Sequence, residues 1–233
     1  MTRFVTATII LLLTSQTSLA HAPVLERSDA SLDNPIRATW PLDTSVAIYG
    51  YLSGPDDVDV VVFDVDEKES ASGVRLYLHT LVPACQAYRQ LLPSVAVVGA
   101  VQPELPGKHS YTGLPFKTNE AQGVRLLTNT KQGPTWYEPY SGKNYFWQRS
   151  MRLSLDEPGP YSIYIWSPDH HLGDYVLAIG TRERWGPREI GRAMRHMPRL
   201  LRDREIHNEA CREELKQQAP STNPLPAEPH SIH

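Results

Sequence analysis

Between Ser45 and Thr181 the sequence alternates short apolar segments with turn-forming ones, and this pattern limits the fold more than any other feature. Proline and glycine separate the segments, as in Ser53-Gly54-Pro55 and Glu157-Pro158-Gly159-Pro160. The eight segments with the length and composition of β-strands are residues 45–52, 58–65, 73–81, 94–99, 123–129, 146–155, 161–166 and 175–180. We predict an all-β fold: an antiparallel two-sheet sandwich, jelly-roll-like, with about eight strands.

The first 20 residues have the features of a cleaved export signal. Arg3 precedes an apolar run from Val5 to Leu13 that is too short to span a bilayer, and the small residues Ser18 and Ala20 suit signal peptidase. We therefore expect residues 1–20 to be a signal peptide. The mature chain would begin at His21 and be exported, to the periplasm of a Gram-negative host or as a secreted protein.

The C-terminal part differs in composition from the sandwich, which we expect to cover residues 21–185. Residues 186–217 are predicted to form a basic helical extension that begins near Pro187 and is kinked or divided at Pro198. Its apolar residues recur at near-helical spacing and are expected to form one stripe packed on the sandwich: Ile190, Met194, Met197, Leu201 and Ile206. Residues 218–233 are rich in proline and are predicted to be a disordered tail.

Charge and cysteine content restrict the partners and the compartment. The whole chain has 23 basic and 26 acidic residues, and removal of the signal takes away one basic residue, Arg3. The mature chain would therefore be acidic, which argues against a general nucleic-acid binder. No second apolar run reaches membrane length, so no integral membrane anchor is expected. Cys85 and Cys211 are predicted either to form a disulfide that closes a loop of about 125 residues, or to remain as two buried thiols.

Several segments together resemble a known group of proteins. The segments are Val46-Ala47-Ile48-Tyr49-Gly50-Tyr51-Leu52, Asp56-Asp57-Val58-Asp59 with Phe63, Trp136-Tyr137-Glu138-Pro139-Tyr140 with Tyr145, Gly159-Pro160-Tyr161-Ser162-Ile163-Tyr164-Ile165, and Asp174-Tyr175-Val176-Leu177-Ala178-Ile179-Gly180 followed by Thr181-Arg182-Glu183. Across roughly residues 21–185 the chain is similar to a family of uncharacterised exported β-sandwich proteins that resemble pre-peptidase C-terminal and GOLD-type domains.

The resemblance implies a fold and a compartment, but no activity. Members of that family commonly end in an apolar C-terminal anchor, whereas this chain has seven arginines between Arg188 and Arg212. Membrane attachment is therefore not carried over. His79 and the pair His170-His171 also depart from the family pattern, so any function they have would be specific to this chain.

A histidine at the start of the mature chain is the most specific indication of chemistry. Its α-amine and ring nitrogen can bind one metal ion together, and nitrogen donors suit Cu(II). Candidates to complete a copper site with His21 are His171, His170 and Glu138, with His79 as a further possibility. The alternative is that His170 and His171 are solvated loop residues and that His79 is a surface histidine on the polar face of its strand.

Other chemistry has weaker support in the sequence. Asp56, Asp57, Asp59 and Asp64 offer oxygen ligands for calcium, but the spacing of an EF-hand is missing, so calcium is less favoured than copper. No esterase, metalloprotease, phosphate-loop or Cys-x-x-Cys motif is present, so the sequence favours a non-catalytic protein over an enzyme.

An aromatic segment supports an alternative function. Trp136, Tyr137, Tyr140 and Tyr145 surround Glu138, which is the composition of a groove for a sugar or a peptide. These rings would otherwise fill the core. We therefore predict an exported non-catalytic binding protein with copper at His21. The alternatives are a carbohydrate- or protein-binding module at residues 136–147, or an accessory subunit that docks a protein partner through the helix Arg188–Arg212.

Overall fold

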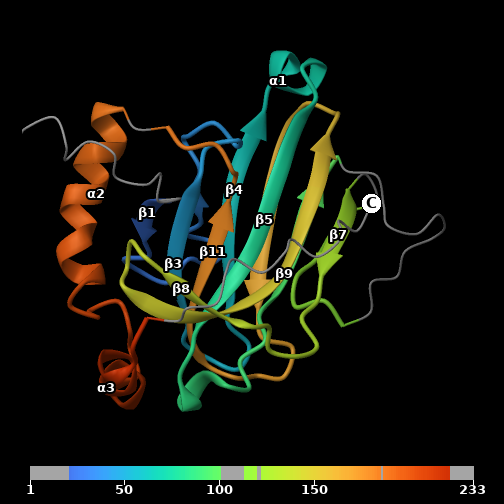
Figure 1. Cartoon of the computed structure of the whole chain (residues 1–233). Helices are drawn as coiled ribbons and strands as arrows, with labels where there is room; N and C mark the ends of the chain where they lie inside the picture. The colour runs from blue at the N-terminus through green and yellow to red at the C-terminus, as the bar shows by residue number, and fades with distance from the viewer. Residues whose placement is uncertain (1–20, 101–112, 120–121, 185, 221–233) are drawn as a thin grey trace, which may run out of the picture.

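Two β-sheets packed face to face form the body of the molecule (Figure 1). The computed structural model describes residues 21–100, 113–119, 122–184 and 186–220; the predicted signal at 1–20 and residues 221–233 of the predicted tail lie outside them. The elements are β1 (Ala22–Leu25), β2 (Ile36–Arg37), β3 (Val46–Leu52), β4 (Val58–Val65), α1 (Glu67–Ala71), β5 (Val74–Pro83), η2 (Gln86–Tyr88), β6 (Ser94–Gly99), β7 (Gly123–Leu127), β8 (Thr135–Glu138), β9 (Lys143–Leu155), β10 (Gly159–Trp166), β11 (Gly173–Ile179), α2 (Pro187–Leu200) and α3 (Glu209–Gln217).

The strand order confirms the predicted sandwich. One sheet has the order β1-β3-β11-β5-β9-β8 and the other β2-β4-β10-β6-β7. Without the short strands β1, β2 and β8, the chain distributes eight strands over the two sheets in the jelly-roll arrangement. These three strands were not predicted from the sequence. β1 and β2 are edge strands that pair in parallel with β3 and β4, so their conformation depends on partners distant in sequence.

The side chains between the sheets form the main core. Its members include side chains with no exposed surface from both sheets: Ile48, Leu76, Leu78, Val97, Ile163 and Leu177. Gly50 is required in this core, because a Cβ at that position would lie 2.5 Å from the ring of Tyr175. The ring of Tyr175 can therefore cross β3, with its hydroxyl donating to Asp59 at 2.7 Å.

A second apolar cluster covers the outer face of the six-stranded sheet. It contains Ala47, Tyr49, Leu81, Trp136, Tyr145, Trp147, Val176 and Leu200. Leu200 comes from the end of α2, which lies beside β1 (Figure 1). The six-stranded sheet is therefore buried on both faces. The alternation of residues in β5 had predicted that its outer face would be solvated.

The predicted apolar stripe of the helical extension is largely wrong. Ile190, Met194 and Leu201 are 47, 72 and 57% exposed. The buried residues of α2 are instead Ala193, His196 and Leu200. Pro198 lies inside α2, which ends two residues later. Among the described residues, no helix is long and apolar enough to cross a bilayer.

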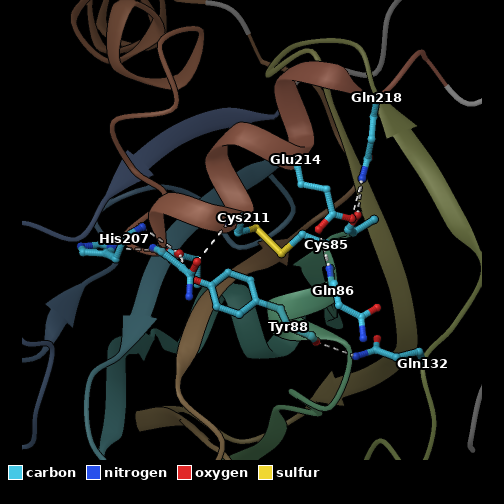
Figure 2. Close-up of a disulfide and its surroundings, with 11 residues drawn as sticks. Cys85, Gln86, Tyr88, Gln132, His207, Cys211, Glu214 and Gln218 are labelled. Carbon is cyan, nitrogen blue, oxygen red and sulfur yellow. Dashed lines mark hydrogen bonds and ion pairs between the residues drawn. A yellow bond between two sulfur atoms is a disulfide. The ribbon is translucent and has the colours of Figure 1, made fainter.

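A disulfide between Cys85 and Cys211 attaches α3 to the sandwich, which confirms the first of the two predictions for these cysteines (Figure 2). Hydrogen bonds reinforce the attachment. Glu214 accepts from the backbone of Gln86 at 2.9 Å, and Gln218 donates to the carbonyl of Ala84 at 2.7 Å. Helix α3 and Gln218 are thus held against the loop that follows β5.

The segment between α2 and α3 is held by buried charges. The ammonium of Lys143 lies 3.0 Å from Asp203 and 2.9 Å from Glu205. Two residues after Glu205, the ring of His207 contacts the buried carboxylate of Asp174. Because Lys143, Asp203 and Glu205 are buried, loss of the lysine or of the acidic residues would leave an unpaired buried charge.

We expect the pair of His207 and Asp174 to make stability depend on pH. The hydrogen bond to Asp174 raises the pKa of His207 above its ordinary 6.5. The contribution of His207 is therefore complete below about pH 6.5 and is lost as pH rises through the raised pKa. Between about pH 5.5 and about pH 8.5, the urea midpoint of the wild-type chain should fall more than the midpoint of His207→Gln. An equal fall in both would contradict this. Because half of the side chain is exposed, the difference should be small.

Candidate metal centre

The histidines predicted to bind copper lie at opposite ends of the six-stranded sheet. His21 directly precedes β1, whose first residue is opposite Val46. His170 and His171 precede β11, whose first residue is opposite Leu52 at the other end of β3. Seven residues of strand separate these ends by about 20 Å. The structure therefore does not bring His170 and His171 to His21.

His170 instead has contacts of its own. Its Nδ1 lies 2.6 Å from the carbonyl of Pro55 and 3.7 Å from the carboxylate of Asp56. The nearby Asp57 accepts two hydrogen bonds from Ser53. The acidic residues considered for calcium are likewise dispersed, because Asp59 is fully buried while Asp64 is exposed on the same strand.

His79 lies next to His21, and it is buried. The two ring centroids are 6.4 Å apart with their planes nearly perpendicular. His79 is 2% exposed and stacks on Trp147 at 4.1 Å. The expectation of a surface histidine was wrong, because the outer apolar cluster covers this face of β5. A register shift between His79 and Leu81 lies beside it, a feature often found next to functional sites.

Neither ring nitrogen of His79 has a hydrogen-bond partner among the described residues. Burial, followed by the charge of His21, lowers the pKa of His79 to about 3, so the ring is neutral with a free lone pair. A buried polar group without a partner costs about 1–3 kcal/mol. A ligand for this ring would remove that cost.

The two histidines line one small pocket. Its volume is about 10 Å³, the room that one water molecule or one ion needs. Ala47 and Ala178 lie between the histidines, since Ala178 is paired with both Ala47 and His79 across neighbouring strands. Their short side chains leave the space open.

Glu138 also lines this pocket, but its carboxylate is already engaged. It accepts from the backbone of Tyr140 at 2.8 Å and of Ser141 at 2.6 Å. Burial raises the pKa of Glu138 above its ordinary value. Glu138 does not form a three-ligand cluster within 4.8 Å with His21 and His79; in the described part of the chain only Glu26, Asp29 and Asp59 form such a cluster. Side chains alone therefore supply two donors.

Three of the four aromatic residues proposed for a sugar or peptide groove line the pocket: Trp136, Tyr140 and Tyr145. Trp136 and Tyr145 are 7% and 1% exposed, and Trp136 meets Trp147 edge to face at 5.2 Å. Tyr137 and Tyr140 are half-buried. The hydroxyl of Tyr140 has no hydrogen-bond partner in the described residues, and burial raises its pKa to about 12, so it remains a donor. Trp136 and Tyr145 present no open ring face on which a sugar could stack.

The importance of His79 was hard to see from the sequence. The signal was present, since Ala47 and Ala178 are small residues at the centres of apolar strands and His79 aligns with them in the sheet. Reading that signal requires the strand order, which the sequence pattern did not provide.

No protein-family model matches the chain, and no curated protein matches it. Among solved structures, it is similar to the pre-peptidase C-terminal domain of a collagenase from Bacillus anthracis, with 17% identity over 62% of this chain and 92% of that one and a TM-score of 0.32. It is also similar to CorA, a surface-associated copper-binding protein of Methylomicrobium album BG8, with 10% identity over 70% of this chain and 99% of that one and a TM-score of 0.28.

A third neighbour is the secreted protein MopE of Methylococcus capsulatus, in which an oxidized tryptophan facilitates copper binding. It shares 11% identity over 57% of this chain and 72% of that one, with a TM-score of 0.24. The neighbours thus include the kind of domain that the sequence resembles. All three TM-scores lie below 0.5, so the chemistry of this pocket is argued from its own geometry.

Proposed function

We propose that this chain is an exported, non-catalytic copper-binding protein whose ion is held between His21 and His79. The observation that supports the proposal is the buried ring of His79, with both nitrogens unpartnered, beside His21 in a pocket large enough for one ion. A metal at this position would satisfy a polar group that the protein leaves without a hydrogen bond.

Cleavage after Ala20 would complete the donor set. His21 would then offer its α-amine as well as its ring, and His79 would add a third nitrogen. Three nitrogen donors suit Cu(II), which heads the affinity order for such sites. The disulfide supports export, because such bonds persist in oxidising compartments such as the periplasm or the extracellular space.

The size of the pocket favours binding over catalysis. Sites for organic ligands usually have volumes of about 300–1,000 Å³. The pocket at His79 has about 10 Å³. It would hold an ion and exclude a substrate.

Copper titration of the exported chain, with its start at His21 confirmed by mass, tests the proposal. We expect one Cu(II) per chain, a nitrogen-rich electron spin resonance spectrum, and binding at least about 100-fold weaker in His21→Ala. A chain that keeps a methionine before His21 should lose affinity as well, because its amine is blocked. His171→Ala is the matched control and should bind as the wild type. Unchanged affinity in His21→Ala would overturn the proposal.

A further inference from the structure

Three carboxylates from distant parts of the chain meet on the side of the sandwich that faces α2. Glu26 and Asp29 lie in the segment that follows β1, and Asp59 is the second residue of β4. Their nearest oxygens all lie within 4.8 Å of one another. The segment is fixed over β4 because the carbonyl of Ala30 accepts from the backbone of Val60.

Hydrogen bonds fix two of these carboxylates in place. Glu26 accepts from the backbone of Ala30 with one oxygen and of Tyr51 with the other, each at 2.8 Å. Asp59 accepts from the hydroxyl of Tyr175 at 2.7 Å. The carboxylate oxygens of Glu26 and Asp59 are therefore held in fixed positions, unlike those of mobile acidic side chains on a surface.

Asp59 is the unusual member. Its side chain has no exposed surface, and its Oδ1 has no hydrogen-bond partner of its own in the described residues. Within the described part of the chain, no cation forms an ion pair with Asp59, Glu26 or Asp29. A buried carboxylate normally has such a partner or coordinates a metal.

The geometry suits a hard divalent cation. Calcium binds oxygens at about 2.3–2.6 Å, so two ligands of one ion lie up to about 5 Å apart. Glu26 and Asp29 also line an open cavity of about 240 Å³, which Arg27, Arg199 and Arg204 line as well. An ion could enter through this cavity, and its waters could complete six to eight ligands. Magnesium requires a near-ideal octahedron, which carboxylates from one loop and one strand would not easily supply.

We infer that Glu26, Asp29 and Asp59 bind a calcium ion that connects the end of β1 to the start of β4. This site is separate from the pocket at His79 and does not depend on the copper proposal. Its affinity should be that of extracellular calcium modules, about 10⁻⁴–10⁻³ M.

Calcium titration of the metal-free mature protein tests the inference. At about 10 mM, calcium should raise the Tm of the wild type by about 3–10 °C, and magnesium by less. Terbium, a calcium mimic, should give luminescence excited through Tyr175, and calcium should quench it by competition. Asp29→Asn should lose both responses; Asp29 is exposed, so the substitution leaves the core intact.

Two controls separate this site from general effects of charge and from the copper site. Asp64→Asn removes an exposed carboxylate from the same strand and should keep both responses. His21→Ala should also keep them, whatever its effect on copper. Calcium that leaves the Tm of the wild type unchanged, or an equal loss in Asp64→Asn and Asp29→Asn, would overturn the inference.

Discussion

Replacing Cys85 and Cys211 together with serine is expected to lower the free energy of unfolding by about 4 kcal/mol. The disulfide joins residues 126 positions apart, and a bond that closes so long a loop removes much conformational freedom from the unfolded chain. Both cysteines are buried, at 2% and 0% exposure, so the serines would also place hydroxyls in the core. Urea unfolding of the oxidised and serine forms at one pH measures the difference.

The slope of the same urea curves offers a second check. Without the bond the unfolded chain is less compact, so the denaturant slope should increase while the midpoint falls. Glu213→Gln breaks only the exposed ion pair with Lys216 near the disulfide and should leave the urea midpoint close to that of the wild type. Equal midpoints for the oxidised and serine forms would show that the bond contributes nothing.

We expect His79→Leu to abolish copper binding and, at the same time, to stabilise the metal-free protein by about 1–2 kcal/mol. The native ring is buried with both nitrogens unpaired, whereas leucine has similar bulk and no polar atom. Two of its neighbours, Leu81 and Trp147, are apolar. Urea unfolding in the presence of a chelator, followed by copper titration, measures both effects.

Opposite effects on stability and binding would identify His79 as a residue retained for its ligand. His171→Leu is the comparison, because His171 is only half-buried and lies at the far end of the sheet. It should leave copper affinity unchanged and shift stability by less than about 0.5 kcal/mol. If His79→Leu destabilised the protein or still bound copper, the proposed role of the pocket would be wrong.

The sandwich could be predicted because its central strands encode it locally. Val58–Val65 and Gly159–Trp166 have turn residues at their ends and β-branched or aromatic residues within, so their conformation needs little help from distant contacts. The two residues of β2 carry no such pattern, and only pairing with β4 makes them a strand. The spacing of Ile190 and Met194 predicted a helix correctly, but it could not show which side faces the sheet.

The site was predicted less completely for a related reason. His21 could be singled out by its position after the signal, which is a local feature. Its neighbour His79 is 58 positions away, and its burial depends on β8, β9 and Leu200 covering a sheet face that the alternation in β5 marks as polar. From the sequence, His170 and His171 were as good candidates as His79 to complete a copper site with His21. Only the strand register shows that they lie far from His21.

The position of Cys211 also affects the order of events when the chain is made. The eleven strands of the described residues all precede this cysteine, so in N-to-C-terminal synthesis or translocation the bond can close only after all of them have emerged. Cys85 must wait as a thiol, or bound to an oxidoreductase, while the sandwich assembles. The disulfide therefore cannot guide any strand pairing that takes place before Cys211 has emerged. A chain that ends before residue 211 would keep one reactive thiol, which a quality-control system could recognise.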